Sequence, residues 1–257
     1  MRPFIFTIGS TRIPSFFFFL MVATLAATFY MYYLAHREKL RPEVILDMGM
    51  IGMIAAILGG RIFHIVVEAP AYYWEKPMRV FEFWRGGFVS YGGFIGVVLS
   101  LWAYFRIRKL PTLIYFDVLA AGAPIVKFFV RVACLLTGCC YGKPTNLPWA
   151  ITFSDPASTA YYYYPNLPLH PTQIYSLIHA TLLFLGVNWV YKHRTFTGQT
   201  TCVLVMGWTI PRAFIEIFRG DVDRGVYFNG LLSTAQITGI VICLIAVFFY
   251  RYLARKK

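Results

Sequence analysis

Seven long apolar stretches, separated by short polar segments, set the pattern of this 257-residue chain. A helix needs roughly 17 to 25 predominantly apolar residues to cross about 30 Å of hydrocarbon, and each stretch is long enough. They predict transmembrane helices near residues 15–35, 44–67, 87–105, 112–136, 171–190, 198–218 and 230–250. The predicted fold class is therefore all-α, a polytopic membrane protein with about seven transmembrane helices.

The composition supports a membrane protein and excludes an ordinary soluble domain. Hydrophobic residues make up 58% of the chain and charged residues 14%, and the mean hydropathy is +0.60. In soluble domains roughly a quarter of the residues are charged. We expect one integral membrane domain, residues 1–257. The first apolar run begins like a signal peptide but lacks a small-residue cleavage site, so we expect a short outer tail and a retained first helix.

The net charge of +13 reflects membrane topology rather than a nucleic-acid partner, which we do not expect. The basic residues lie in short runs between apolar spans, and half of the 24 Lys and Arg residues fall on one side of the membrane: Arg37, Lys39, Arg41, Arg106, Arg108, Lys109, Lys192, Arg194, Arg251, Arg255, Lys256 and Lys257. The positive-inside rule places this side, with the C-terminus, in the cytoplasm and the N-terminus outside. Loops 68–86, 137–170 and 219–229 then face outward.

Arg131 and Arg212 are the most demanding of the arginines within apolar spans, where an ionised side chain costs at least ~2.5 kcal/mol and needs a partner or a function. Arg131 is near the outer end of the fourth span and Arg212 near that of the sixth. Arg212 and Glu216 are four residues apart, so they share a helix face and can pair. One interpretation is a structural ion pair; the other is a pair of guanidinium groups that grips a phospholipid phosphate. Lys127 either snorkels or adds to the positive field.

Glycines concentrate in the second and third spans. The segment RGGFVSYGGFIG (85–96) predicts a bend and a close backbone approach at the outer end of the third span, with Tyr91 pointing into a cavity. In GGRIFH (59–64) the glycines allow close helix packing. We expect Arg61 to pair with Glu68 or with a neighbouring span.

Three cysteines cluster in RVACLLTGCCYG (131–142). One interpretation is a metal site formed by Cys134, Cys139, Cys140 and His170. The favoured one is a set of small residues in a tight helix-to-loop corner, because adjacent cysteines do not match the C-x-x-C zinc pattern and a disulfide between neighbours is strained. Apolar surroundings then raise the thiol pKa. We expect no metal and no cofactor.

Two further polar positions have structural interpretations. Asp117 falls in the first turn of the fourth span, where a carboxylate complements the helix dipole. The segment HPTQIY (170–175) opens the fifth span, with Pro171 suited to the first turn and Gln173 able to cap the helix.

In chain order, the motifs GGRIF, RGGFVSYGGFIG, RVACLLTGCCYG, HPTQIY and RAFIEIFRGDVDRG resemble those of the phosphatidylglycerol:prolipoprotein diacylglyceryl transferase family, over roughly residues 44–240. The resemblance implies a seven-helix enzyme of the bacterial inner membrane, with its N-terminus outside. Such an enzyme moves a diacylglyceryl group from phosphatidylglycerol to the lipobox cysteine thiol of prolipoproteins and releases glycerol phosphate. The implied partners are phosphatidylglycerol, the prolipoprotein signal peptide with its lipobox cysteine, and membrane lipids.

The resemblance also implies site residues. Arg131 falls on the arginine that opens the motif R-x-G-N-F-x-N-G-E-x-x-G, and Gly142 falls on its last glycine. Arg212 and Glu216 fall on the Arg and Glu of R-F-x-x-E-x-x-R-x-x-D. The predicted catalytic residues are Arg131, Arg212, Glu216 and Tyr91, and the predicted substrate-binding residues are Arg131, Arg212, Gly142, Arg61, Gly92 and Gly93.

The chain departs from the family pattern at several polar positions. Cys134 and Thr137 stand where the motif has asparagine, Cys139 stands where it has glutamate, and Tyr91 replaces a histidine. Two alternatives therefore stay open: a family paralogue, non-catalytic or of different specificity, that binds phospholipid or lipoprotein, and a transporter. Buried charges and glycine-broken helices are also typical of transporters, but the chain shows no internal repeat.

Overall fold

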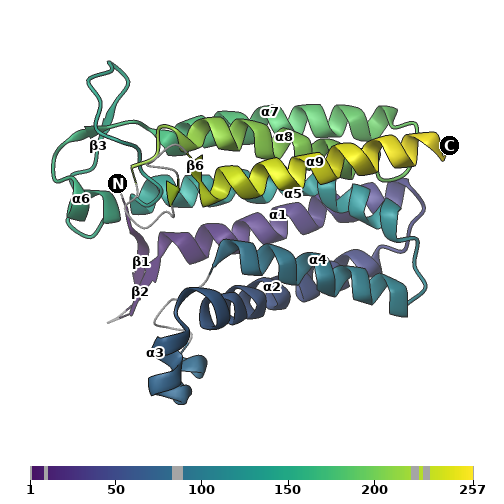
Figure 1. Ribbon diagram of the computed structural model, residues 1–257, viewed down its shortest axis with the longest axis horizontal. Helices are drawn as coiled ribbons and strands as arrows, with labels where there is room; N and C mark the ends of the chain where they lie inside the picture. The colour runs from purple at the N-terminus through teal and green to yellow at the C-terminus, as the bar shows by residue number, and fades with distance from the viewer. Residues whose placement is uncertain (1, 9–10, 83–88, 221–225, 228–231, 257) are drawn as a thin grey trace. The chain divides into compact units, whose positions relative to one another are not determined.

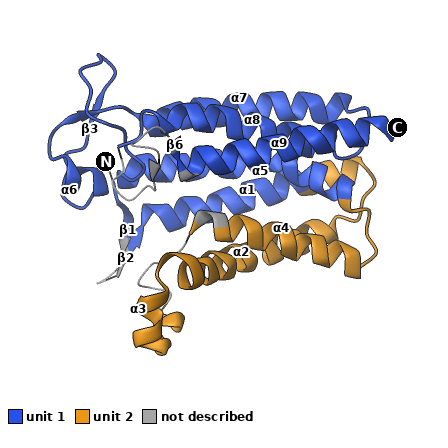
Figure 2. Ribbon diagram, in the orientation of Figure 1, with its two compact units in different colours: residues 1–31, 113–257 blue, residues 32–112 orange. Residues whose placement is uncertain are grey.

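The computed structural model describes the chain except residues 1, 9–10, 83–88, 221–225, 228–231 and 257. Within the described residues it is mostly helical, and a helix occupies each of the seven predicted spans (Figure 1). The chain divides into two compact units, residues 1–31 with 113–257 and residues 32–112 (Figure 2). The single integral membrane domain over residues 1–257 stays a prediction.

The first unit contains a short hairpin and five long helices. Strands β1 (Phe4–Ile8) and β2 (Thr11–Pro14) pair antiparallel, with Phe4 opposite Pro14, and lead into α1 (Ser15–Arg37), whose last residues belong to the second unit. The elements that follow are α5 (Thr112–Thr137), β3 (Ile151–Thr152), α6 (Thr159–Tyr163), β4 (Pro168–Leu169), α7 (Thr172–His193), α8 (Gln199–Glu216), β5 (Val226–Tyr227), β6 (Leu232–Ser233) and α9 (Thr234–Arg255). β3 pairs with β4 and β5 with β6, both antiparallel.

The second unit is built on two helices that pack against each other, α2 (Glu43–Phe63) and α4 (Ser90–Ile107). Between them lie the π-helix η1 (His64–Glu68), the short helix α3 (Pro70–Glu75) and the 3-10 helix η2 (Pro77–Phe81).

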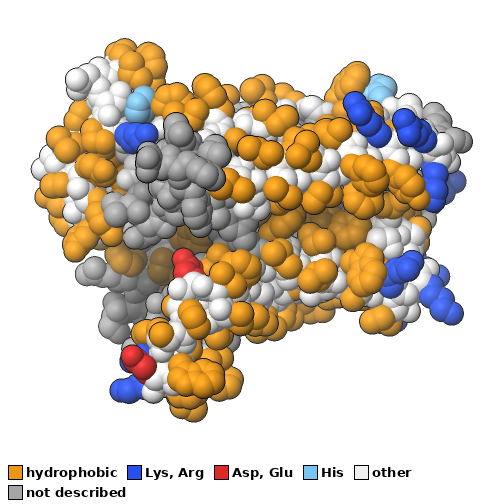
Figure 3. Space-filling model, in the orientation of Figure 1, with side chains coloured by type: hydrophobic (Ala, Val, Ile, Leu, Met, Phe, Trp, Pro, Cys, Tyr) orange, Lys and Arg blue, Asp and Glu red, His pale blue; other side chains and the backbone are white. Residues whose placement is uncertain are grey.

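The helices confirm a multi-pass membrane protein. Among the described residues, five helices are long and apolar enough to cross a membrane: α1, α2 continued by η1, α5, α7 and α9. The two remaining predicted spans contain α4, whose described apolar part is shorter, and the more polar α8. Hydrophobic side chains cover the visible flank of α9, with basic side chains at its C-terminal end (Figure 3). Leu244 and Phe248 of α9 are 65% and 66% exposed, as expected of side chains that face lipid.

Polar side chains join the helices of the first unit in its interior. Asn188 of α7 accepts a hydrogen bond from the Tyr30 hydroxyl of α1 at 2.6 Å and donates to the Ala121 carbonyl of α5 at 3.2 Å. α8 packs between α7 and α9 in the contact order α7, α8, α9. Such interhelical hydrogen bonds hold helices together where lipid removes the usual hydrophobic driving force.

Asp117 stabilises a neighbouring helix. It is fully buried in α5, and its carboxylate accepts hydrogen bonds from the Gly198 amide at 2.7 Å and from the amide and hydroxyl of Thr201, both at 2.9 Å. Amides in the first turn of a helix have no partner within that helix. The structural role predicted for Asp117 is confirmed, but the helix whose N-terminus it serves is α8 rather than its own.

We expect Asp117→Ala to lower the free energy of unfolding by on the order of 3 kcal/mol, because it leaves the buried Gly198 amide and the partly buried Thr201 amide and hydroxyl without this partner. The measurement is the thermal midpoint of the purified protein in detergent. Thr201→Val is the matched control, since it removes the hydroxyl and keeps the amide, and we expect a loss of about 1 kcal/mol. Equal losses in the two variants would contradict the capping role.

Glycines bring α2 and α4 into backbone contact. A Cβ at Gly59 would lie 2.5 Å from the Gly92 carbonyl oxygen, and one at Gly96 would lie 2.6 Å from the Ala55 carbonyl oxygen. The predicted close packing of 59–64 is therefore confirmed. The bend predicted for the third span is wrong from residue 90 onward, since α4 is helical there; residues 85–88 lie outside the described part of the chain.

Arg61 stabilises the segment after α3, residues 79–82, through hydrogen bonds to its backbone. Its side chain is 4% exposed and donates to the carbonyl oxygens of Arg79 at 2.5 Å, Val80 at 3.3 Å and Glu82 at 3.2 Å. The predicted partners were Glu68 or a neighbouring span, whereas these carbonyls belong to η2 and to the residue that follows it. A guanidinium group has five donors in a planar fork, so it can satisfy several carbonyls at once.

Candidate functional site

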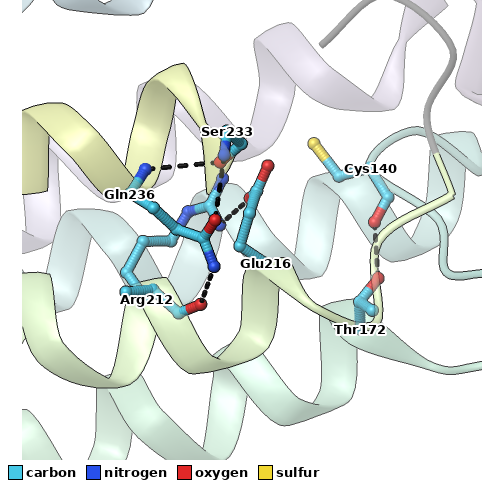
Figure 4. A network of polar contacts seen from close by, with 7 residues as sticks. Cys140, Thr172, Arg212, Glu216, Ser233 and Gln236 are labelled. Atoms are coloured by element: carbon cyan, nitrogen blue, oxygen red, sulfur yellow. Dashed lines mark hydrogen bonds and ion pairs between the residues drawn. The ribbon is translucent and has the colours of Figure 1, made fainter. Parts of the chain in front are cut away.

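The predicted pair of Arg212 and Glu216 is confirmed. Both residues lie in the last turns of α8, and Nη1 of Arg212 forms an ion pair with Oε2 of Glu216 (Figure 4). The Glu216 side chain is 4% exposed and that of Arg212 is 21% exposed. Arg212 therefore keeps part of its surface accessible, while Glu216 fixes it from the buried side.

The beginning of α9 supports this pair. Ser233 and Gln236 form a capping box. The Ser233 hydroxyl accepts a hydrogen bond from the backbone N–H of Gln236 at 3.3 Å, and the side-chain oxygen of Gln236 accepts one from the backbone N–H of Ser233 at 2.9 Å. The Gln236 side-chain nitrogen also donates to the Ala213 carbonyl at 3.1 Å, next to Arg212 (Figure 4). The S-x-x-Q signature of a capping box marks this residue in the sequence. The hydrogen bond from Gln236 to Ala213 joins the beginning of α9 to α8 beside the ion pair.

Arg131 lies near enough to Arg212 of α8 and to Arg219 for their charges to interact, which residue spacing alone does not establish. It lies in α5, half-buried, and it is electrostatically coupled to Arg212 and to Arg219, which follows α8. Lys127, one turn before Arg131, lies within reach of the charges of Arg131 and Arg212. The three arginines come from two separate segments and share one region of the first unit, which is suited to an anion.

Backbone pairing brings Arg219 into this region. Gly142 and Arg219 form an antiparallel bridge, flanked by hydrogen bonds from the Lys143 amide to the Phe218 carbonyl at 2.9 Å and from the Gly220 amide to the Tyr141 carbonyl at 3.1 Å. Arg219 is not among the site residues predicted from the sequence. Its signal is its spacing, three residues after Glu216 in the same motif.

Lys127 is held inside the bundle, so the snorkelling interpretation is wrong. It is 5% exposed, and its Nζ lies 2.8 Å from Nδ1 of His179 and 4.1 Å from the centre of the Trp208 ring. Nε2 of His179 lies 2.8 Å from the Gly207 carbonyl and so donates to it. Nδ1 is then free of a proton and accepts a hydrogen bond from the Lys127 side-chain nitrogen. His179 was missed, although an ionisable residue in an apolar span is itself a signal.

Two residues with a left-handed backbone conformation form the corner after α5, and two side chains of α7 stabilise it. Gly138 has φ 69° and Cys140 has φ 56°, so the chain turns sharply between them. The Thr172 hydroxyl donates to the Cys140 carbonyl at 2.7 Å (Figure 4), and the Gln173 side-chain nitrogen donates to the Cys139 carbonyl at 2.8 Å. Gln173 therefore stabilises the corner. The prediction that it caps its own helix, α7, is wrong.

Three thiols gather at this corner. The sulfurs of Cys134, Cys139 and Cys140 lie within 4.8 Å of one another, close enough to share a metal ion. Hydrogen bonds with Cys134 and Cys139 lower the pKa of the Cys140 thiol well below its ordinary value; the charges of Arg131 and Arg219 lower it further, against burial. At Cys139 the hydrogen bond with Cys134 acts the other way, but the hydrogen bond with Cys140 and burial raise the thiol pKa to about 11. The predicted raised pKa is therefore confirmed for Cys139 and wrong for Cys140, where the corner stabilises a negative charge.

The other predicted site residues lie in the second unit. Tyr91 is the second residue of α4, and its side chain lies outside the described part of the structure. A Cβ at Gly92 would overlap the Phe63 side chain, and one at Gly93 would lie 3.0 Å from a carbonyl oxygen of α2. Both glycines thus serve helix packing. A contact of Arg61, Gly92 or Gly93 with substrate stays a prediction.

Comparisons with known proteins agree with the motifs. A family model described as prolipoprotein diacylglyceryl transferase matches residues 3–252. Relatives named phosphatidylglycerol–prolipoprotein diacylglyceryl transferase include one from Clostridium tetani, 28% identical over 97% of both chains. The relative from Methylocella silvestris is 33% identical over 75% of this chain and 70% of its own, and that from Nitrosospira multiformis is 30% identical over 82% and 75%.

Proposed function

The chain belongs to the prolipoprotein diacylglyceryl transferase family, and from this premise we propose that it transfers the diacylglyceryl group of phosphatidylglycerol to the lipobox cysteine thiol of bacterial prolipoproteins. The observation that carries the proposal is the gathering of Arg131, Arg212 and Arg219 from two segments of a membrane protein. At such a depth the anion available in quantity is a phospholipid phosphate. The arrangement supports binding of this headgroup.

In this proposal Arg131 and Arg212 hold the lipid phosphate. A guanidinium group offers a planar, permanently charged fork that matches phosphate oxygens in a bidentate manner. Glu216 orients Arg212 through their ion pair, and Arg219 adds to the positive field. We further propose that Gly142, Arg61, Gly92 and Gly93 line the substrate site.

The reaction is a displacement at the carbon of the diacylglyceryl unit that carries the phosphate ester. The sulfur of the acceptor cysteine forms a bond to this carbon, the carbon–oxygen bond breaks, and glycerol phosphate leaves with the bonding electron pair. The thiol proton passes to water or to the leaving phosphate. Because the leaving phosphate gains negative charge in the transition state, Arg131 and Arg212 stabilise it electrostatically, which is commonly the largest catalytic contribution.

Tyr91 occupies the position at which the family motif has a histidine. A phenol has an ordinary pKa of about 10 and is a poor general base at neutral pH. We therefore assign Tyr91 a hydrogen bond to the lipid in place of proton abstraction.

The proposed location is the bacterial cytoplasmic membrane, with the N-terminus outside, the C-terminus in the cytoplasm, and loops 68–86, 137–170 and 219–229 facing outward. The exposed basic residues at the end of α9 support this orientation. In this orientation Arg131, Arg212 and Arg219 lie near the outer surface of the membrane, together with the C-terminal ends of α5 and α8.

The experiment is transfer of labelled diacylglyceryl from phosphatidylglycerol to a lipobox peptide by the purified protein. We expect label in the peptide, with one glycerol phosphate released for each peptide modified. The matched control is a peptide in which serine replaces the acceptor cysteine, which is expected to stay unlabelled. A folded protein that binds phosphatidylglycerol and transfers nothing would favour a paralogue with another task.

A further inference from the structure

The cysteine corner has the donor spacing of a metal site. Cys134 comes from the last turns of α5, Cys139 and Cys140 follow the turn at Gly138, and their three sulfurs lie within 4.8 Å of one another. A zinc ion about 2.3 Å from each of three sulfurs sets the sulfurs about 4 Å apart. The cluster therefore reaches metal-binding geometry by contracting by less than about 1 Å.

The surroundings hold the sulfurs in place before any metal binds. The carbonyls of Cys139 and Cys140 are fixed by Gln173 and Thr172, and the Thr137 hydroxyl donates to the Cys139 sulfur at 3.4 Å. Hydrogen bonds of this kind orient metal ligands and raise the affinity of a site. These contacts make the cluster a built site rather than three thiols that happen to be near one another.

Charge and donor type define the class of ion. Soft thiolate donors select zinc-like ions over magnesium or calcium. Three thiolates and one divalent ion carry a net charge of −1, and the positive charges of Arg131 and Arg219 act on Cys140. The corner therefore supplies both the ligands and the counter-charge that such a complex requires.

We propose that Cys134, Cys139 and Cys140 bind one thiophilic divalent metal ion of the zinc class. His170, the fourth ligand considered from the sequence, is engaged elsewhere, because its Nδ1 lies 3.3 Å from the Tyr175 hydroxyl and its ring packs against Phe218. The fourth position of a tetrahedral ion is then open to water or another small ligand. This site goes beyond the transferase function and does not depend on it.

The test is titration of the reduced, purified full-length protein with Zn²⁺, with bound metal counted by mass spectrometry and with Mg²⁺ as the hard-ion control. We expect one Zn²⁺ per chain and no competition by Mg²⁺. Replacement of outer partners already weakens metal sites 10- to 100-fold, so loss of a ligand in Cys134→Ser, Cys139→Ser or Cys140→Ser is expected to weaken binding at least about 100-fold. Cys243→Ser, in α9, is the matched control and is expected to bind as the wild type does.

A second measurement needs no variant and so does not depend on how the cysteine variants fold. Zn²⁺ is expected to slow alkylation of Cys139 and Cys140 in the native protein at least about 10-fold relative to Cys243, as measured by peptide mass spectrometry. Absence of saturable Zn²⁺ binding, binding that persists in all three serine variants, or alkylation rates indifferent to Zn²⁺ would each overturn the proposal.

Discussion

Replacing Arg131 or Arg212 by alanine is expected to lower the rate of diacylglyceryl transfer by about 10²- to 10³-fold, the usual loss when one group that stabilises developing charge is removed. Each substitution takes away a guanidinium group from the region where the leaving phosphate gains charge. Because the two residues come from α5 and α8, the loss of either leaves the phosphate held from one side only. The measurement is the initial rate of label transfer to the lipobox peptide.

Conservative variants separate charge from shape at these two positions. Arg131→Lys and Arg212→Lys keep the positive charge but lose the planar fork, so we expect rates between those of the alanine variants and the wild type. Tyr91→Phe removes a single neutral hydrogen bond and is expected only to weaken transfer, by about 10-fold or less. Turnover at the wild-type rate in either alanine variant would overturn the assignment of the arginines.

Features set by neighbouring residues in the chain could be predicted from the sequence. The seven helical segments follow from the lengths of the apolar runs, and the pair of Arg212 and Glu216 follows from a separation of four residues on one helix. Both depend on local geometry alone. The two predictions about helix content and this ion pair are accordingly confirmed.

Features set by long-range pairing could not be predicted. The meeting of Arg131 with Arg219 depends on the strand-like pairing between Gly142 and Arg219, which are far apart in the chain. The contact between Lys127 and His179 likewise joins residues 52 positions apart. Contacts between residues so far apart in the chain leave no periodic pattern in the sequence. Lys127 was therefore left with two interpretations, and His179 was overlooked.

The cysteines show why average burial is a poor guide to one group. An apolar environment raises the pKa of an isolated thiol. At Cys140 the other two thiols donate hydrogen bonds and two arginines contribute positive charge, and together they outweigh burial. The thiols become neighbours because the chain turns at Gly138, and Arg219 comes near them because residues 141–143 pair with residues 218–220 after α8.

Glycine-rich segments were ambiguous for a related reason. Glycine permits both a bend and a close helix contact, and the sequence does not say which one is used. In residues 90–96 the contact partner is α2, so Gly92 and Gly96 serve packing within a regular helix. Only the position of the partner helix decides between these two uses.

Gly142→Ala is expected to lower transfer by about 100-fold and to destabilise the fold by about 1 to 3 kcal/mol, as overpacking typically does. A Cβ at Gly142 would lie 2.4 Å from both the Cβ and the carbonyl oxygen of His170, and a Cβ at Gly220 would lie 2.6 Å from the Gly142 carbonyl oxygen. The backbone around Gly142 therefore has no room for a side chain at either glycine. Its displacement would move Arg219 and the corner that carries Cys140 by a fraction of an ångström or more.

Gly186→Ala is the matched control, because a Cβ at Gly186 in α7 meets no atom within 4 Å. Alanine is favoured over glycine in a helix by up to about 1 kcal/mol, so this variant is expected to be at least as stable as the wild type and equally active. The measurements are the thermal midpoint in detergent and the initial rate of transfer, made on both variants. If Gly142→Ala matched Gly186→Ala in both, the close approach at Gly142 would have no part in holding the arginines together. A lower rate at an unchanged midpoint would instead locate its effect in the geometry of the phosphate site.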